Sequence, residues 1–373
     1  MVKYENIKKN MKEKIVNLTK QLVRFRSHED SLLEKRKIFN FVDDWFLGRE
    51  IKTEKFDHPK HPSLLVNIPG VKAKTVLLMA HLDVVSASDE MFEVKLENDI
   101  MRGRGVLDNK GVVAMLMLLI EKLKESSEDL PSVKILFTTD EEIGGENGAG
   151  RVAGYDHFQD VDFIIAPDGG LQNKIIHKEK GILQLSFEVK GKSGHGAKPW
   201  LSDNPIEKAY ELYQKISRFL SDLESDSEWY STVSLTKLIA GKEINRIPES
   251  AEMSIDIRCT EKHIPEELLE KIRLFFDDSV KVKNINISQF LYSPSDHDYI
   301  KKYHQVMEEE SGEKVSIEGE HSGSDASHFM PLQVPIILHR ANGGDVHSEN
   351  EWASISSFEK MMLGLEKFLK DFN

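Results

Sequence analysis

Two histidines and five carboxylates stand out because each follows an apolar run or lies in an adjoining glycine-rich loop. The runs TVLLMAHLDVV, SVKILFTTDEE and DFIIAPDGG deliver acidic groups or a histidine, and GGDVHSENE carries a second histidine. The residues concerned are His81, Asp83, Asp108, Glu141, Glu142, Asp168 and His347. Because ligands of open α/β sheets bind outside the carboxyl ends of the strands, we expect these side chains to converge on one edge of a sheet.

Their side chains are typical donors for a metal ion. Histidine nitrogens and carboxylate oxygens suit a borderline divalent ion such as zinc, and a donor set without cysteine argues against a closed structural site. Five ligands taken from these seven residues exceed what one tetrahedral ion needs, so two ions that share a carboxylate are the simplest explanation. Such a pair can activate water and polarise a carbonyl group. Glu141 and Glu142 are adjacent, so they point to different sides if the strand persists, which allows one ligand and one base.

Each of these residues has a simpler explanation when taken alone. A single Asp or Glu at a strand end is usually a helix cap or a solvated charge, and a single histidine is usually a hydrogen-bonded surface residue. Only the convergence of several such residues at predicted sheet ends favours a site. Five other histidines have no such context and are expected to be structural: His157, His177, His321, His328 and His339.

The elements that must position these residues change in character along the chain. In residues 1–179, apolar strands alternate with helical segments such as VVAMLMLLIEKLKE, which predicts an α/β fold with a mainly parallel mixed sheet flanked by helices. In residues 180–291, the alternating strands LQLSFEVKG and AEMSIDIRC predict an α+β unit with an antiparallel sheet. Residues 292–373 return to a helix, an apolar strand and the loop of His347. We therefore expect residues 180–291 to be inserted into a metal-binding domain.

Composition and charge exclude several classes of protein. The 373 residues are 39% hydrophobic and 30% charged, as in ordinary globular proteins. No window approaches the roughly 18 consecutive apolar residues of a membrane span. The first residues predict an amphipathic helix rather than a signal peptide, and the single cysteine, Cys259, fits a reducing compartment, so we expect a cytoplasmic location. The net charge of −13 argues against a nucleic-acid partner, and no phosphate-loop or dinucleotide fingerprint follows a strand.

Seven segments, in order along essentially the whole chain, resemble a family of metallohydrolases. The family includes aminoacylase, acetylornithine deacetylase, succinyl-diaminopimelate desuccinylase, glutamate carboxypeptidase and tripeptidase enzymes. The matching segments are HLDVV, GRGVLDNKG, TTDEEIGGENGAG, APDGG, GKSGHGAKPW, INRIPESAEMSIDIR and GGDVHSENE. The resemblance implies a zinc-exopeptidase-like catalytic domain with an inserted lid and dimerisation domain. It also implies a homodimer that hydrolyses a small peptide or an N-acyl amino acid with two divalent ions, zinc or alternatively cobalt or manganese.

The resemblance further assigns roles around the metal ions. His81 and Asp168 would bind one ion, Glu142 and His347 would bind the other, and Asp108 would bridge the two. Asp83 would orient the imidazole of His81, since a partner on the second ring nitrogen fixes the tautomer. Glu141 would take a proton from the attacking water and deliver it to the leaving nitrogen.

Further roles concern the substrate. Arg258 would clamp a substrate carboxylate, a task suited to a planar guanidinium, with Asn245 and Gly323 as neighbouring contacts. Taken alone, Arg258 on a strand could equally form a surface ion pair. His195 would reach the active site of a partner subunit and stabilise the oxyanion, although without the resemblance it would be regarded as a surface-loop histidine.

The sequence leaves more than one class of substrate possible. Asp168 stands where the deacetylase and desuccinylase branches usually carry Glu, which favours the peptidases of the family. A deacylase of a biosynthetic intermediate is the alternative within the enzymes. An inactive relative that binds peptides or metal is a third possibility, and the presence of Glu141 with all five ligand-type residues argues against it.

Overall fold

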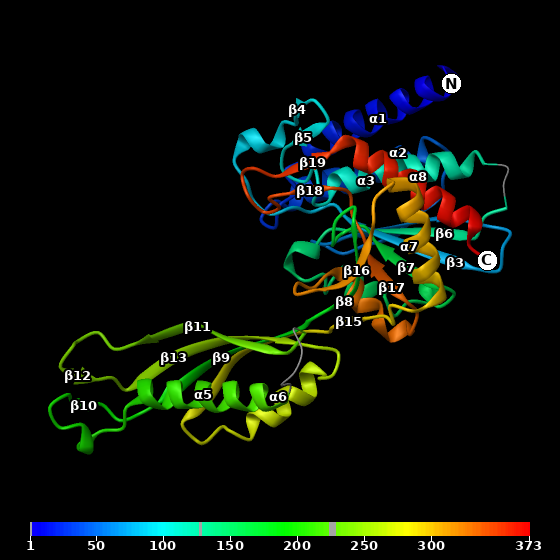
Figure 1. The fold of residues 1–373 in the computed structure, drawn as a ribbon. Coiled ribbons are helices and arrows are strands. Elements are labelled where there is room, and N and C mark those ends of the chain that lie inside the picture. The colour runs from blue at the N-terminus through cyan, green and yellow to red at the C-terminus, as the bar shows by residue number, and fades with distance from the viewer. Residues whose placement is uncertain (1, 127–128, 224–228) are drawn as a thin grey trace. The chain divides into compact units, whose positions relative to one another are not determined.

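The computed structural model describes residues 2–126, 129–223 and 229–373, and the chain divides into two compact units (Figure 1). Unit 1 comprises Met1–His177, Tyr292–Glu320 and Ser324–Asn373. Unit 2 comprises Lys178–Leu291 and His321–Gly323. That residues 180–291 form a lid and dimerisation domain, inserted between residues 1–179 and 292–373, stays a prediction.

A nine-stranded mixed sheet organises unit 1, in the order β1-β2-β6-β3-β7-β17-β8-β15, with β16 also paired to β8. The neighbours β6, β3, β7 and β17 run parallel, whereas β1, β2 and β8 pair antiparallel with their neighbours. This confirms the predicted mixed sheet with a parallel centre. The strands are β1 Thr53–Phe56, β2 Ser63–Ile68, β3 Thr75–His81, β6 Ser132–Thr138, β7 Phe163–Ala166, β8 Lys174–Glu179, β15 Leu291–Tyr292, β16 Ser316–Glu320 and β17 Ile336–Leu338.

Helices cover the sheet and complete one large apolar core. Alternate residues of β3, namely Val76, Leu78 and Ala80, belong to the same buried cluster as the helices, so they share one face of the sheet. The apolar segment after Lys110 forms a helix, as predicted. The helices in this cluster are α1 Val2–Val23, α2 Leu32–Leu47, α3 Lys110–Lys124, α7 Asp298–Ser311 and α8 Ile355–Asp371. Among the described residues, no helix combines the length and apolar character that a membrane crossing requires.

A second, small sheet in unit 1 brings two distant loops together. Its order is β18-β19-β5-β4, with β4 Lys95–Glu97, β5 Ile100–Arg102, β18 Gly343–Gly344 and β19 Trp352–Ser354. Because Arg102 at the end of β5 pairs with Trp352 at the start of β19, the loop after β5 and the loop before β19 leave the same end of the sheet. These two loops carry Asp108 and His347.

Unit 2 is built on a four-stranded antiparallel sheet in the order β11-β13-β9-β14. Its strands are β9 Gly181–Lys190, β11 Thr232–Ala240, β13 Ser250–Cys259 and β14 Val280–Ser288. The helices α5 Pro205–Leu223 and α6 Pro265–Arg273 share a buried core with alternate residues of β9 and β13. A two-stranded ribbon joins β10 Gly194–His195 to β12 Arg246–Ile247.

Candidate metal centre

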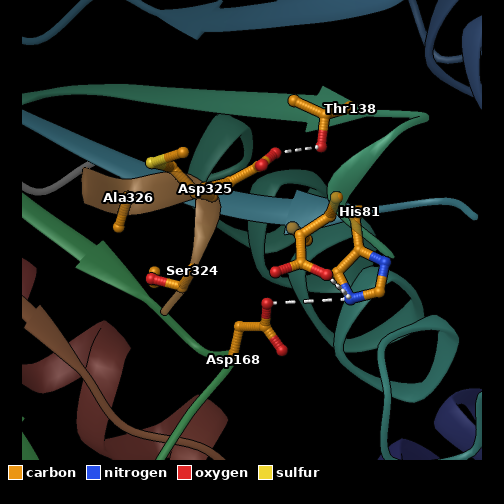
Figure 2. Close-up of a pocket in the computed structure, with 10 residues that line it drawn as sticks. His81, Thr138, Asp168, Ser324, Asp325 and Ala326 are labelled. Atoms are coloured by element: carbon orange, nitrogen blue, oxygen red, sulfur yellow. Dashed lines mark hydrogen bonds and ion pairs between the residues drawn. The ribbon is translucent and has the colours of Figure 1, made fainter. Parts of the chain in front are cut away.

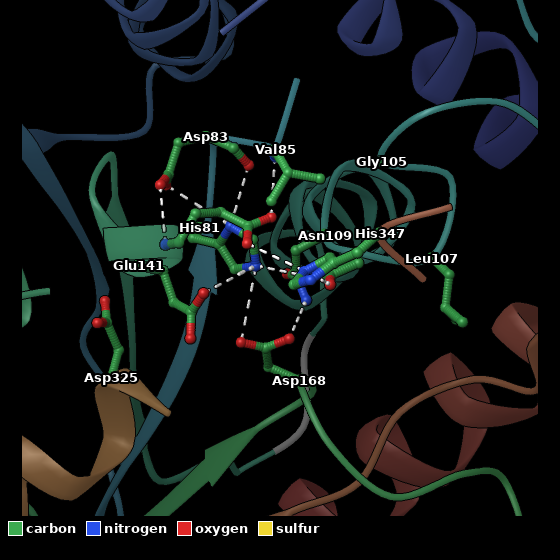
Figure 3. A network of polar contacts seen from close by, with 12 residues as sticks. His81, Asp83, Val85, Gly105, Leu107, Asn109, Glu141, Asp168, Asp325 and His347 are labelled. Carbon is green, nitrogen blue, oxygen red and sulfur yellow. Dashed lines mark hydrogen bonds and ion pairs between the residues drawn. The ribbon is translucent and has the colours of Figure 1, made fainter. Parts of the chain in front are cut away.

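Three adjacent parallel strands of unit 1 end beside one another and deliver polar side chains to one edge. β3 ends at His81, β6 ends shortly before Glu141, and β7 ends shortly before Asp168. Figure 3 shows these side chains turned toward one another, together with His347 from the loop before β19. The convergence expected from the strand ends is therefore present in the structure.

The imidazole of His81 is buried and held from behind by Asp83. Its Nδ1–H donates to the backbone carbonyl of Asp83 over 3.0 Å, and one carboxylate oxygen of Asp83 lies 3.6 Å from the same nitrogen. The other oxygen of Asp83 accepts a hydrogen bond from the backbone N–H of Glu142 over 3.1 Å. Asp83 thus fixes the ring of His81 and the turn that carries Glu142, which leaves the Nε2 of His81 directed at the carboxylates.

The carboxylate of Asp108 lies between two histidines. Its Oδ1 is 2.9 Å from the Nε2 of His81, and its Oδ2 is 3.2 Å from the Nε2 of His347. Glu142 Oε2 lies 3.0 Å from the same nitrogen of His347, and Asp168 Oδ2 lies 3.7 Å from the Nε2 of His81. A carboxylate placed in this way can offer one oxygen to each of two ions.

The strand that precedes Glu141 and Glu142 does not persist through them. β6 ends at Thr138, and Glu141–Ile143 forms a short 3-10 turn, η2. The turn still separates the two side chains, because Glu141 Oε2 lies 3.9 Å from His81 and Glu142 Oε2 faces His347. The division into one ligand and one base is therefore possible for a different reason than the one expected.

Glu351 supports the loop of Asp108 and was not singled out in the sequence. Its buried carboxylate accepts hydrogen bonds from the backbone N–H groups of Gly105, Leu107 and Asp108, and it pairs with the buried guanidinium of Arg104 over 2.6 Å. Glu351 lies in the quoted segment GGDVHSENE, but its partner Asp108 is 243 residues away in the sequence. Nothing in the segment itself indicates this contact.

We expect Glu351→Ala to destabilise the protein and to reduce its metal content. Removing one partner of a buried ion pair leaves the other charge uncompensated, which costs about 3–5 kcal/mol, and it also frees the loop of Asp108. Chemical denaturation and elemental analysis measure the two effects. Glu349→Ala is the matched control, because Glu349 is exposed and bonded to Ser88. Equal behaviour of the two variants would contradict the role given to Glu351.

Asn109 is a second supporting residue that sequence reasoning missed. Its side-chain Nδ2 donates to Asp168 Oδ1 over 3.1 Å and to the backbone carbonyl of Pro167 over 3.2 Å. One oxygen of Asp168 is thereby held in place while the other faces His81.

The backbone of His347 lies in the left-handed region, with a φ of 63°. This is a strained conformation that often marks functional residues.

Several carboxylates lie close together in the cluster, so a bound positive charge would stabilise them. Among the described residues, the ion pairs of its carboxylates are all with the two histidines. Burial, reinforced by the charge of Asp168, raises the pKa of Glu141 well above its ordinary value, and burial also raises the pKa of Glu142. Hydrogen bonds to Asp108 and Glu142 raise the pKa of His347 to about 10. These shifts show that negative charge is crowded here.

The donors fit divalent ions. Two groups of residues each bring their ligand atoms within 4.8 Å of one another. One group is His81, Glu141 and Asp168, and the other is His81, Asp108 and Glu142. In addition, Asp83 Oδ1 is buried without a hydrogen-bond partner among the described residues. Nitrogen and oxygen donors with excess negative charge are the donor set of zinc, cobalt or manganese sites. Because Glu141 belongs to the first group, geometry alone permits it to be either a ligand or a base.

The remaining predicted residues lie in unit 2 and form two separate pairs. His195 and Asn245 are neighbours, because β10 pairs with β12 and the N–H of Gly196 donates to the carbonyl of Asn245 over 2.8 Å. Arg258 and Gly323 both lie beside Ile182, which pairs with Arg258 and lies 3.6 Å from where a Cβ on Gly323 would stand.

The two pairs occupy opposite ends of the unit 2 sheet. β13 starts at Ser250, shortly after Asn245, and Arg258 stands eight residues further along it, which corresponds to about 26 Å of extended strand. Within a single chain Asn245 therefore does not lie beside Arg258, and the role of Asn245 as a substrate contact stays a prediction. The segment INRIPESAEMSIDIR contains both residues, but a fully extended strand keeps them apart.

The five histidines expected to be structural make ordinary contacts. His177 and His339 are buried and bonded to backbone carbonyls, His157 pairs with Glu54, and the ring of His321 lies against Trp229. His328 is of more interest, because its Nε2–H donates to the carbonyl of Gly144 in the loop that follows Glu142.

The family model "Peptidase family M20/M25/M40" matches residues 77–371 of this chain. In sequence, the chain is 23% identical over 346 residues to the succinyl-diaminopimelate desuccinylase of Rickettsia bellii (strain OSU 85-389), with 86% of this chain and 88% of that protein covered. The matched residues include all five predicted ligands and Glu141.

Two solved structures share the fold. Aminopeptidase PepT of Bacillus cereus ATCC 10987 superposes with a TM-score of 0.80 at 18% identity, covering 96% of this chain and 98% of the other. The YXEP protein of Bacillus subtilis, described as a dinuclear metal binding peptidase from the M20 family, superposes with a TM-score of 0.70 at 16% identity, covering 97% and 98%. At these identities the likeness establishes the fold.

Proposed function

The chain belongs to peptidase family M20/M25/M40, and on this basis we propose that it hydrolyses the peptide or amide bond of a small peptide or an N-acyl amino acid. The observation that carries the proposal is the position of Asp108, with one carboxylate oxygen toward His81 and the other toward His347. If two divalent ions bind here, a carboxylate in this position would be able to offer one oxygen to each of them. The protein is accordingly a metallohydrolase, and we propose that it binds two ions.

We assign the donors as follows. His81 and Asp168 would hold one ion, Glu142 and His347 the other, and Asp108 both, with zinc as the proposed metal and cobalt or manganese as alternatives. When bound, the two ions would polarise the scissile carbonyl and make water a stronger acid. Asp83 and Asn109 keep His81 and Asp168 in position for this task, and Glu351 does the same for Asp108.

Glu141 is the proposed general base. Its carboxylate lies on the same side as His81 and Asp168, and it is mostly buried, with 16% of its side chain exposed. A base acts best when its pKa is near the working pH, and burial shifts the pKa of Glu141 in that direction. Glu141 would remove a proton from water as the oxygen attacks the carbonyl carbon. It would then pass that proton to the nitrogen, so that the amine leaves uncharged.

The proposal is tested by assaying the purified protein, supplemented with metal, against a panel of substrates. The panel contains dipeptides, tripeptides, and N-acetyl and N-succinyl amino acids. We expect release of free amino acid from at least one class. The Rickettsia relative is named as a desuccinylase, which favours a deacylase as the second candidate, whereas Asp168 favours peptides. Failure to hydrolyse any member with zinc, cobalt or manganese would contradict the proposal.

Arg258→Ala is expected to weaken capture of substrates with a free carboxylate by about tenfold or more, since a charge-assisted hydrogen bond contributes about 1.5–3 kcal/mol. The guanidinium is 29% exposed and pairs with Asp256 over 3.3 Å, which leaves it access to solvent. The measurement compares KM for free-acid and amidated forms of one substrate, and the amidated form should suffer less.

The matched control for Arg258 is Asp256→Asn, which breaks the ion pair but keeps the guanidinium. If Arg258 binds the substrate, this control retains the preference for the free acid. If Arg258 serves only its ion pair with Asp256, both variants lose stability alike and neither changes the ratio between free-acid and amidated substrates.

We also propose a homodimer through unit 2. β11 is an edge strand of the unit 2 sheet, and exposed edges are where sheets of two chains pair. Large exposed apolar side chains lie on β11, on the loop after it and on the adjoining start of α5: Leu238, Ile239, Ile244, Ile206 and Tyr210. A second copy of the chain would cover them. Because a single cysteine fits a reducing compartment, the proposed location is the cytoplasm.

A further inference from the structure

The carboxylate of Glu141 is not fixed by a hydrogen bond of its own. Among the described residues, its ion-pair partner is the Nε2 of His81 at 3.9 Å, which is too long for a hydrogen bond. Its position therefore depends on the backbone of the loop between β6 and α4 Ala149–Val152. A base on a loop works only if the loop is held rigidly, because small displacements of a reacting group reduce the rate strongly.

The first part of the support is internal to the loop and comes from Asp140. Its carboxylate accepts hydrogen bonds from the N–H groups of Asn147 and Gly148 over 2.9 and 3.0 Å, and its carbonyl accepts from Gly145 over 2.8 Å. These bonds close the loop on itself on both sides of Glu141. They do not attach it to the rest of unit 1.

The second part comes from the 3-10 helix η5 Asp325–Leu332, far away in the sequence. Thr138, the last residue of β6, donates its hydroxyl hydrogen to Asp325 Oδ2 over 2.9 Å (Figure 2). The same carboxyl group packs against Gly145, where a Cβ would stand only 1.6 Å from Asp325 Oδ1. Asp325 thus contacts the loop on both sides of Glu141.

His328, one turn further along η5, provides another attachment. Its Nε2–H donates to the carbonyl of Gly144 over 2.8 Å, and its ring lies 3.1 Å from where a Cβ on Gly150 would stand. η5 therefore contacts the end of β6 at Thr138 and the loop itself at Gly144 and Gly145, all within a few residues of Glu141. Gly145 has a φ of 65°, so a side chain there would meet both strain and the Asp325 carboxyl.

We propose that Asp325, with His328, is a positioning residue for Glu141, acting by fastening the loop between β6 and α4 to η5. The inference rests on the proposed role of Glu141 as the base. Asp325 also lines the same pocket as His81, Glu141 and Asp168, but it belongs to neither group of candidate ligand atoms. Its contribution is the oxygen that Thr138 donates to and the surface against which Gly145 packs.

The isosteric amide is a natural control for the carboxyl of Asp325. Burial, with the neighbouring carboxylates of Asp140 and Asp83, raises the pKa of Asp325 well above its ordinary value. The side chain of Asn has the shape of the carboxyl, and its carbonyl oxygen can still accept the hydrogen bond from Thr138. Asp325→Ala removes both the acceptor and the packing, whereas Asp325→Asn keeps them.

The test measures kcat, KM, metal content and amide hydrogen exchange of residues 140–148 for Asp325→Ala, Asp325→Asn, Thr138→Val and Thr138→Ser. We expect Asp325→Ala to lower kcat by up to about 100-fold, the scale of a misplaced catalytic group, with KM and metal content unchanged and faster exchange in the loop. Thr138→Val, which removes the donated hydroxyl hydrogen, should show a smaller loss in the same direction. Asp325→Asn and Thr138→Ser should both restore kcat.

Unchanged kcat in Asp325→Ala, or a loss of metal in proportion to activity, would overturn the inference. So would an Asp325→Asn variant as slow as Asp325→Ala, because the oxygen that accepts from Thr138 would then not be the relevant feature. Glu141→Gln assayed alongside separates the two proposals. If Glu141→Gln remains active, the role of Glu141 fails; if it is inactive while Asp325→Ala is unaffected, only the positioning role fails.

Discussion

Glu141→Gln is expected to lower kcat by roughly two to four orders of magnitude while metal content and folding stay unchanged, the usual scale for loss of a general base. The amide has the shape of the carboxylate but cannot accept a proton from water. The variant should also lose the acid limb of the dependence of kcat on pH, because that limb reports the ionisation of the base. Steady-state kinetics over pH, with elemental analysis of the same samples, measures both effects.

Glu142→Gln is the informative contrast. The carboxylate of Glu142 lies 3.0 Å from the Nε2 of His347 and is assigned as a ligand. The amide of the variant should therefore impair metal binding first and activity as a consequence. Glu146→Gln is the matched control, because Glu146 is exposed in the same loop and should behave as the unaltered protein. Because Glu141 also lies within ligand distance of His81 and Asp168, loss of metal in Glu141→Gln with full retention in Glu142→Gln would exchange the two roles.

His195→Ala is expected to reduce kcat by on the order of a hundredfold or more, as removal of one oxyanion donor does, without changing metal content. His195 is exposed in unit 2, and its Nδ1 accepts a hydrogen bond from the backbone N–H of Ala197 over 3.1 Å. Because Nδ1 accepts this bond, Nε2 is the ring nitrogen that can donate a hydrogen bond to an oxyanion. Lys198→Ala, in the same exposed loop, is the matched control and should be near normal.

The sharper test asks whether His195 acts on the partner subunit. If the protein is the proposed dimer, a mixture of His195→Ala and Glu141→Ala chains will form hybrid dimers after subunit exchange. If His195 acts in trans, one site of each hybrid combines an intact Glu141 with the intact His195 of the other chain, so activity returns. Ile239→Lys, which places a charge on the exposed edge of β11, should abolish both the dimer and this recovery. A fully active monomer, or no recovery despite confirmed exchange, would refute the proposal.

Strand-end residues of the candidate site could be predicted because the strands that carry them are recognisable. The apolar runs before His81, Glu141 and Asp168 are buried strands of a parallel sheet, and parallel neighbours end at the same edge. The pattern did not show where β6 ends. Thr138 and Thr139 are both compatible with a strand by composition, and the turn at Glu141 depends on hydrogen bonds from Asn147 and Gly148 to Asp140.

Supporting residues could not be predicted because their partners are remote in sequence. Asp325 is separated from Thr138 by 187 residues, and Glu351 from Asp108 by 243. Neither residue lies in a periodic pattern, and each is a buried carboxyl that only its three-dimensional contacts explain. The arrangement within unit 2 was missed for the opposite reason. Asn245 and Arg258 are close in sequence, but an extended strand carries them apart.

The number of divalent ions bound per chain tests the two-metal account most directly. Protein purified without chelator, dialysed gently and analysed for metals should contain about two ions per chain, since a shared carboxylate between two histidines is built for a pair. Chelator should abolish hydrolysis, and activity should return as zinc, cobalt or manganese is restored to that ratio. Protein that reproducibly contains no metal and hydrolyses its substrate fully in the presence of chelator would contradict the account.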